Sequence, residues 1–259
     1  MPRWWGATVL AVVTASCGVV RSTPRVDAPL PVSDEQDEAT IRSTDLTHPR
    51  TLVWVRRFCA PAHGGPQTAL GMKRGRAVLP TLESILDEQG LPRMLVAVPA
   101  VESRFHANAR GRHGEVGMWQ LRVATARRFG SYVGPGRDDR RHLERGTRTA
   151  ARYLAYLHAR YGDWPLALAA YNAGEGRVDR ALRRTGQSDF WALAADGALP
   201  RHTREYVPRV LAAARVLAAP DREACGPTRA VRADPTYRSD RDRHERGPHA
   251  PHDRVAAGG

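Results

Sequence analysis

Apolar residues recur at offsets of three and four through the centre of the chain, which is the spacing of a helical stripe. The clearest stripes lie at 79–86, 95–102, 150–161 and 207–217. No segment alternates apolar and polar residues convincingly, so the pattern predicts no strand. The sequence therefore predicts an all-α fold.

Residues suited to helix ends support these helices. Gly90 and Gly162 each follow closely after an apolar stripe, where glycine commonly ends a helix. Asp163 is placed to cap a further helix, and Pro165 then falls in the first turn, where proline is tolerated. The residues suited to helix ends therefore agree with the helices predicted from the apolar stripes.

The segment 108–117, NARGRHGEVG, interrupts the helical pattern with three glycines, and it predicts a loop. Glu102 lies shortly before it, on the same stripe as Leu95 and Val98. A carboxyl group among apolar residues is costly to ionise, so its pKa rises toward the range of a general acid. Glu102 is therefore a candidate catalytic acid. The alternative is a glutamate that ends the helix and reaches solvent beside Arg104.

The first residues are typical of an export signal. Arg3 precedes a short apolar stretch, and small residues lead to Cys17, so we predict a signal peptide at 1–17. The sequence Thr-Ala-Ser-Cys resembles a bacterial lipoprotein processing site, at which Cys17 would be lipidated and anchor the protein to a membrane. Ordinary cleavage nearby is the alternative. We predict an exported protein of the bacterial cell envelope, either periplasmic or an outer-membrane-anchored lipoprotein.

Composition divides the rest of the chain. Residues 18–50 are rich in polar residues and proline without apolar periodicity, and they predict a flexible tether. Residues 226–259 are mostly arginine, aspartate, histidine, proline and glycine, and they predict a disordered basic tail. The folded domain is predicted at 51–220, with a catalytic core at about 85–218.

Two cysteines, Cys59 and Cys225, remain if Cys17 is lipidated or removed. Both would lie in an oxidising compartment and flank the predicted domain, which favours a disulfide between them over two buried thiols.

The formal net charge of +13 predicts attraction to polyanions. Lys73 is the only lysine, and the arginines are scattered rather than gathered on one stripe. A solvated basic surface is therefore favoured over a nucleic-acid face, and we predict no nucleic-acid partner. The tail histidines lack the ordered spacing of metal ligands, and we predict no metal and no cofactor.

Four motifs carry a resemblance to a known family. They are, in chain order, Glu102-Ser103, the GMWQ sequence at 117–120, the AYNAG sequence at 170–174, and Tyr206 in TREYVP. Together they resemble the catalytic domain of the lytic murein transglycosylases, most closely the membrane-bound type D, over about residues 54–217.

The resemblance implies a lysozyme-like helical domain with a groove for peptidoglycan glycan strands. The implied reaction breaks the β-1,4 bond between N-acetylmuramic acid and N-acetylglucosamine and leaves a 1,6-anhydro end without consuming water. The roles carried over are these: Glu102 as acid and then base, Ser103 as a polar support, Gln120, Tyr171 and Asn172 as sugar-binding residues, and Tyr206 as a hydrogen-bonding partner near the acid.

Two further interpretations stay open. If Glu115 in the loop reaches the groove, a second carboxylate would permit hydrolysis, as in goose-type lysozymes.

Glu175 is expected to cap the next helix rather than to catalyse. A non-catalytic wall-binding lipoprotein is the remaining alternative, and the presence of Glu102 speaks against it.

Overall fold

The structure is a computed structural model that describes residues 41–59 and 66–218. Several predictions lie outside these residues: the signal peptide at 1–17 with Cys17, most of the tether, Cys225 and the tail at 226–259. In the described part of the chain, no helix is both long enough and apolar enough to span a bilayer.

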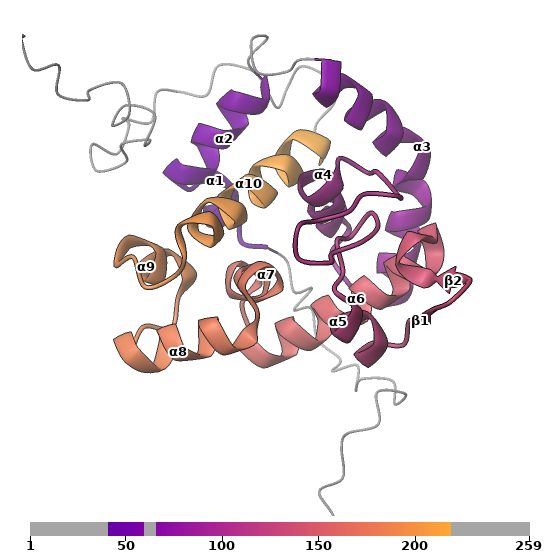
Figure 1. Ribbon diagram of the computed structural model, residues 1–259. Helices are drawn as coiled ribbons and strands as arrows, with labels where there is room; N and C mark the ends of the chain where they lie inside the picture. The colour runs from indigo at the N-terminus through magenta and orange to yellow at the C-terminus, as the bar shows by residue number, and fades with distance from the viewer. Residues whose placement is uncertain (1–40, 60–65, 219–259) are drawn as a thin grey trace, which may run out of the picture. The chain divides into compact units, whose positions relative to one another are not determined.

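The described residues are mainly helical, as predicted (Figure 1). The α-helices are α1 (Ser43–Thr47), α2 (Pro49–Cys59), α3 (Pro66–Glu88), α4 (Ala97–Ser103), α5 (Val123–Arg128), α6 (Leu143–Tyr161), α7 (Trp164–Ala173), α8 (Glu175–Thr185), α9 (Phe190–Ala195) and α10 (Arg201–Ala218). Two short 3-10 helices, η1 (Arg93–Val96) and η2 (Asp139–Arg141), complete the helical set of the described ranges.

The predicted stripes form the core. Their fully buried members include Leu82, Leu86, Leu95, Val98, Leu154, Leu157, Val207, Val210 and Leu211. The predicted helix ends are also confirmed. Gly162, which has a positive φ, caps α6 directly after Tyr161, and the Asp163 carboxylate accepts a hydrogen bond from the Leu166 amide at the start of α7. The local pattern therefore located these helices correctly.

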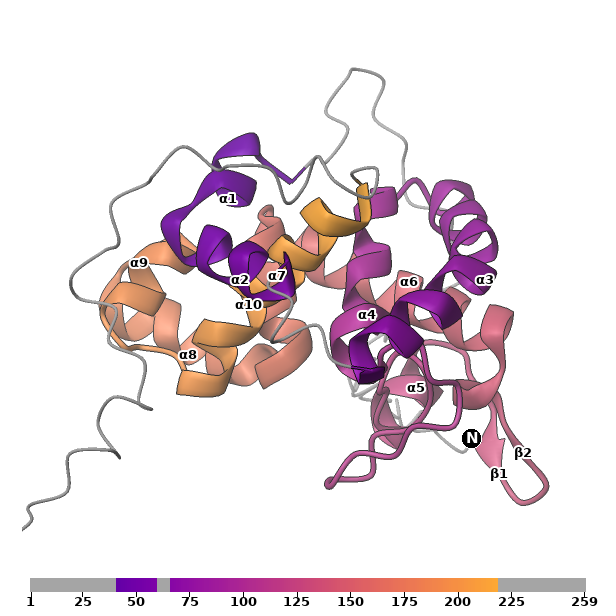
Figure 2. The ribbon, with the colours of Figure 1, turned by 90° about the horizontal axis from the view of Figure 1, so that it is seen from above.

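A small hairpin was not expected. Strands β1 (Val133–Gly134) and β2 (Arg137–Asp138) pair antiparallel, and they lie beside α5 at the periphery (Figure 2). Two residues a strand are too few for an apolar alternation to show in the sequence.

The helix predicted from the stripe at 95–102 is divided into two elements. Residues 93–96 form η1, and α4 follows from Ala97. Pro99 has no amide hydrogen to donate to the carbonyl of Leu95, so one hydrogen bond of a continuous α-helix would be missing at the junction of η1 and α4. Leu95 and Val98 still face the core, and Glu102 still follows them on α4.

Helix α10 runs through the middle of the described domain, where it packs against α2, α4 and α7 (Figure 1). Most of its residues from Thr203 to Ala214 are buried. Because α4 and α7 both contact α10, residues from three distant parts of the chain meet along it.

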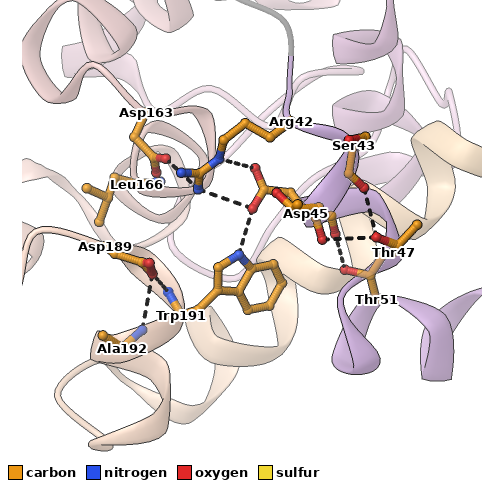
Figure 3. A network of polar contacts seen from close by, with 11 residues as sticks. Arg42, Ser43, Asp45, Thr47, Thr51, Asp163, Leu166, Asp189, Trp191 and Ala192 are labelled. Atoms are coloured by element: carbon orange, nitrogen blue, oxygen red, sulfur yellow. Dashed lines mark hydrogen bonds and ion pairs between the residues drawn. The ribbon is translucent and has the colours of Figure 1, made fainter. Parts of the chain in front are cut away.

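The folded domain begins earlier than predicted. The tether was expected to extend to residue 50, but α1 and the start of α2 lie within 41–50, and Ile41 is buried. The Asp45 carboxylate is 2% exposed and accepts hydrogen bonds from Arg42 and from the indole of Trp191 at 2.7 Å (Figure 3). Arg42 also pairs with Asp163 at 3.1 Å. Because polar contacts hold this segment, no apolar period marked it in the sequence.

Candidate active site

Glu102 lies at the end of α4, directly before a strained turn. Arg104 and Phe105 have φ values of 53° and 58°, which are uncommon for residues with a side chain. Their amides bond to the carbonyls of Ala100 and Pro99, and this closes the helix. The Phe105 ring is buried so close to Gly75 that a Cβ there would lie 2.8 Å from it. Tight packing therefore holds the turn in its strained conformation, and strain of this kind is often found at functional sites.

The Glu102 carboxyl group is half-buried, and its pKa is raised to about 7. Burial is the main cause, because removal from water disfavours the charged form. The Tyr206 hydroxyl and the positive charge of Arg209 oppose this shift, while the negative charge of Glu115 adds to it. The pKa leaves a large fraction of Glu102 protonated near neutral pH, as a general acid requires.

Two tyrosines lie within electrostatic range of Glu102. Burial raises the pKa of the Tyr171 and Tyr206 hydroxyls, and the neighbouring Glu102 raises both further. Tyr206 is 3% exposed, and within the described chain its hydroxyl oxygen makes no hydrogen bond of ordinary geometry. The Tyr206 hydroxyl nevertheless lowers the pKa of Glu102 and so favours its carboxylate form. Both phenols are therefore neutral neighbours of the acid.

The second motif is joined to the acid's helix and to the third motif. The Ser103 hydroxyl donates to the carbonyl of Met118 at 2.7 Å, and the Tyr171 hydroxyl donates to the carbonyl of Trp119 at 2.6 Å. The Gln120 amide donates to the carbonyl of Gly117 at 2.7 Å. Three of the residues predicted to serve the site thus fix the loop that follows Glu102.

Gly117 is required by the path of this loop. Its φ is +86°, and a Cβ added there would lie 1.8 Å from the carbonyl oxygen of Arg140. The Gly117 amide also donates to the carbonyl of Ala109 at 2.9 Å. Only glycine fits such an approach between two backbones.

Arg140 organises the same loop and was missed by the sequence analysis. It is 6% exposed, and its guanidinium donates to the carbonyls of Gly114 and Leu121, both at 3.0 Å. Asp138 pairs with it at 2.8 Å. Nothing in the run RDDRR distinguishes a buried arginine from exposed ones, so the sequence offered no signal for it.

Asn172 and Arg209 complete the surroundings. The Thr203 hydroxyl, fully buried on α10, donates to the Asn172 side-chain oxygen at 2.9 Å. Arg209 lies three residues after Tyr206, hence on nearly the same helix face, and its guanidinium lies 5.7 Å from the Trp54 ring centroid. The spacing of three residues from Tyr206 could therefore have predicted from the sequence that Arg209 lies near the site.

Glu115 and Glu175, the two other glutamates weighed from the sequence, make different contacts. The Glu115 carboxylate accepts a hydrogen bond from the His113 amide at 2.9 Å, and it still influences Glu102 electrostatically. The expectation that Glu175 caps a helix is wrong: the cap of α8 is Gly174, with no side-chain bond. Glu175 instead accepts hydrogen bonds from Arg128 and Tyr153.

Cys59 is disulfide-bonded. Because Cys17 and Cys225 both lie outside the described residues, the pairing of Cys59 with Cys225 stays a prediction. In the ranges 41–59 and 66–218, no group of three or more His, Cys, Asp or Glu side chains is placed to hold a metal ion.

The elements above define a helical domain in which one half-buried glutamate lies in the last turn of a helix, near two tyrosines. Residues 82–194 match the model of the Transglycosylase SLT domain family, so this part of the chain is similar to that family.

Individual relatives agree with the family match. The chain is 36% identical over 135 residues to "Membrane-bound lytic murein transglycosylase D" of Escherichia coli strain K12, a match that covers 50% of this chain and 29% of that protein. It is 35% identical over 125 residues to "Peptidoglycan transglycosylase gp16" of Escherichia phage T7, which covers 47% of this chain and 9% of that protein. The chain therefore spans less than a third of the length of either relative.

A solved structure shares the fold. A 70-kDa soluble lytic transglycosylase, determined in complex with bulgecin A, superposes with a TM-score of 0.52 and 22% identity over 67% of this chain and 29% of its own. The lysozyme-like helical fold expected from the motifs is thus confirmed.

Proposed function

We propose that this chain is a peptidoglycan lytic transglycosylase that cleaves the β-1,4 bond between N-acetylmuramic acid and N-acetylglucosamine. The observation that carries the proposal is the pKa of Glu102, which burial raises to about 7. A carboxyl group with this pKa is able to give a proton and take one back at neutral pH. The names of the relatives support the same substrate class.

In this mechanism the single carboxyl group of Glu102 acts twice. It first protonates the glycosidic oxygen, and the bond from that oxygen to the anomeric carbon breaks. The 6-hydroxyl oxygen of the muramic acid then bonds to the anomeric carbon, and its proton passes to the Glu102 carboxylate. The acid is regenerated, no water is used, and the product has a 1,6-anhydro end. Attack within one sugar needs no second activated reactant, so positioning supplies much of the rate.

The remaining site residues support that glutamate. Tyr206 and Arg209 stabilise the carboxylate that Glu102 becomes when it gives up its proton in the first step, whereas burial favours the protonated form that it regains in the second. Gln120, Tyr171 and Asn172 would contact the sugars, and Ser103 would act by holding the loop.

The test is digestion of purified sacculi followed by mass spectrometry of the released muropeptides. We expect anhydro products from the wild type and a loss of at least about a thousandfold in rate from Glu102→Gln, which keeps the shape and removes the acid. Glu144→Gln on the exposed face of α6 is the matched control and should retain activity. Wild-type protein that binds sacculi but releases nothing would leave only a wall-binding role.

One observation favours hydrolysis as a second candidate function. The charge of Glu115 raises the pKa of Glu102, so the two carboxyl groups lie within electrostatic range. Reducing ends in the products, lost in Glu115→Gln, would establish a two-carboxylate mechanism and replace the transglycosylase proposal.

We also propose that the protein is anchored in the bacterial cell envelope through lipidated Cys17. The lipoprotein-like sequence before Cys17 and the name of the Escherichia coli relative support this. Metabolic labelling with a fatty acid should mark the wild type and spare Cys17→Ala. An unlabelled wild type that is recovered from the soluble envelope fraction would contradict the anchor.

A further inference from the structure

A groove of about 690 Å³ lies away from Glu102, between α8 and the segment 197–200 that leads into α10. Four arginines line it, Arg177, Arg180, Arg183 and Arg184, and the other described lining residues are small or apolar. None of the described residues that line the groove is acidic. Its surface is therefore strongly positive.

Helix geometry separates the basic and acidic residues of α8. Arg177, Arg180 and Arg184 stand at offsets of three and four and share one face. Glu175 and Asp179 point to the other side, where arginines of neighbouring helices engage them: Arg128 of α5 binds Glu175 at 3.2 Å, and Arg160 of α6 binds Asp179 at 2.7 Å. Both acids of α8 are thus paired with arginines outside the groove, and of the groove arginines Arg183 also lowers the pKa of Asp179 through its charge.

Most N–H donors of these four guanidiniums are not used within the described chain. Within the described chain none of them lies within ion-pairing distance of a carboxylate. Arg177 donates to the carbonyl of Ala173 and Arg184 to that of Ala198, each through one nitrogen. Arg180 and Arg183 are exposed. A guanidinium presents five N–H groups, so most donors in this cluster remain available.

The groove adjoins a residue proposed to bind sugar. Arg177 is fixed to the carbonyl of Ala173, the residue after Asn172, at 2.9 Å. On the opposite wall, Pro200 accepts a bond from the amide of Thr203, and the Thr203 hydroxyl binds Asn172. A glycan strand that contacts Asn172 would therefore carry its substituents toward the arginines.

We propose that this groove binds the acidic peptide stems of murein glycan strands through their carboxylates; the proposal rests on the proposed function. Arginine forks pair with carboxylates through two parallel hydrogen bonds, which gives both affinity and orientation. Stems are covalently attached to the strand that Asn172 would contact, so the same substrate molecule fills both sites. That continuity favours a stem over an unattached phosphate polymer, which the charge alone would also accept.

The test compares the affinities of two soluble glycan oligomers, one with peptide stems and one with the stems removed. All proteins carry Glu102→Gln so that the ligand stays intact, and binding is followed by calorimetry. We expect Arg180→Gln/Arg183→Gln to weaken binding of the stem-bearing oligomer about tenfold and to leave the stem-free oligomer unchanged. Added salt should weaken stem-bearing binding more in the parent than in this double variant.

The control double variant is Arg56→Gln/Arg215→Gln, which removes the same charge from α2 and α10 outside the groove. It should bind both oligomers like the parent. An equal loss in the control, or an equal loss on the stem-free oligomer, would overturn the proposal. Binding of inorganic polyphosphate in preference to the stem-bearing oligomer would assign the groove to a phosphate polymer instead.

Failure of this proposal and failure of the proposed function are distinguishable. Cleavage of the stem-free oligomer by wild-type protein reports on Glu102 alone. If cleavage occurs and the arginine variants bind normally, the groove proposal is wrong and the enzyme proposal stands. If the stem-dependent loss occurs without any cleavage, the groove binds stems in a protein that is not an enzyme.

Discussion

The hydroxyl group of Tyr171 donates a 2.6 Å hydrogen bond to the carbonyl oxygen of Trp119, and so joins two motifs that lie 52 residues apart in the chain. The same tyrosine is electrostatically coupled to Glu102. Trp119 is itself fixed, because its indole donates to the Thr147 hydroxyl at 2.9 Å. The loop beside the acid is therefore held from both sides by hydrogen bonds.

Tyr171→Phe should lower the free energy of unfolding by about 1–2 kcal/mol, because it leaves the carbonyl of Trp119 without its partner. It should also reduce cleavage of sacculi, since the loop carries Gln120. Thermal denaturation and a muropeptide assay measure the two effects. An unchanged stability would show that water replaces the hydroxyl at no cost.

Glu102→Gln should stabilise the fold above neutral pH. The pKa of Glu102 is about 7 in the folded protein against a usual 4.5, so the folded state holds its proton more tightly. Wild-type stability therefore falls as pH rises from 4.5 to about 7 and stays reduced above it. The difference in stability between Glu102→Gln and the wild type should grow by up to about 3 kcal/mol between pH 4 and pH 8.

Denaturant unfolding at several pH values measures this difference. Glu144→Gln, on the exposed side of α6, provides the comparison and should show no such growth. A difference between Glu102→Gln and the wild type that stays constant with pH would mean that the carboxyl group is well solvated.

Tyr206→Phe should move the pH dependence of activity. In the wild type the rate should fall above about pH 7, as Glu102 loses the proton it must donate. The Tyr206 hydroxyl lowers the pKa of Glu102, so its removal should shift this decline to higher pH and reduce the maximal rate. Tyr132→Phe, at an exposed tyrosine directly before β1, should leave the profile unchanged. A profile for Tyr206→Phe that declines at lower pH than the wild type would reverse the assigned effect.

Gly117→Ala should cost more than about 3 kcal/mol, because the added methyl group meets the carbonyl of Arg140 and the positive φ is also strained. Gly114 offers a matched comparison in the same loop: its φ is +83°, and nothing lies within 4 Å of the position of its Cβ. Gly114→Ala should therefore cost only about 1 kcal/mol. Equal losses in the two variants would attribute the whole effect to backbone strain.

Asp45→Ala should destabilise the domain by about 2 kcal/mol, because it removes the acceptor for Arg42 and for the Trp191 indole (Figure 3). Asp87→Ala breaks an exposed ion pair with Arg93 and should change stability little. Chemical denaturation compares the two. A loss no larger for Asp45 than for Asp87 would show that residues 41–50 add nothing to the stability of the domain.

Much of the fold followed from local pattern. The stripe with Leu154 and Leu157 placed α6, and Asp163 capped α7 as its position indicated. The start of the domain was wrong because Asp45 holds α1 through polar contacts to Arg42 and Trp191, the last of them 146 residues away. The spacing of apolar residues along the chain cannot predict such long-range polar contacts.

The sequence by itself determined the helices and the order of the motifs, because helical periodicity, capping residues and glycine positions act over a few neighbouring residues. The tertiary structure alone decided the chemistry of Glu102. Its pKa depends on burial and on Tyr206 and Arg209, which approach it only because α10 packs against α4. The same holds for the arginine groove, where the acids of α8 are turned toward partners on α5 and α6. Electrostatic energies depend on distance in space, and folding sets those distances.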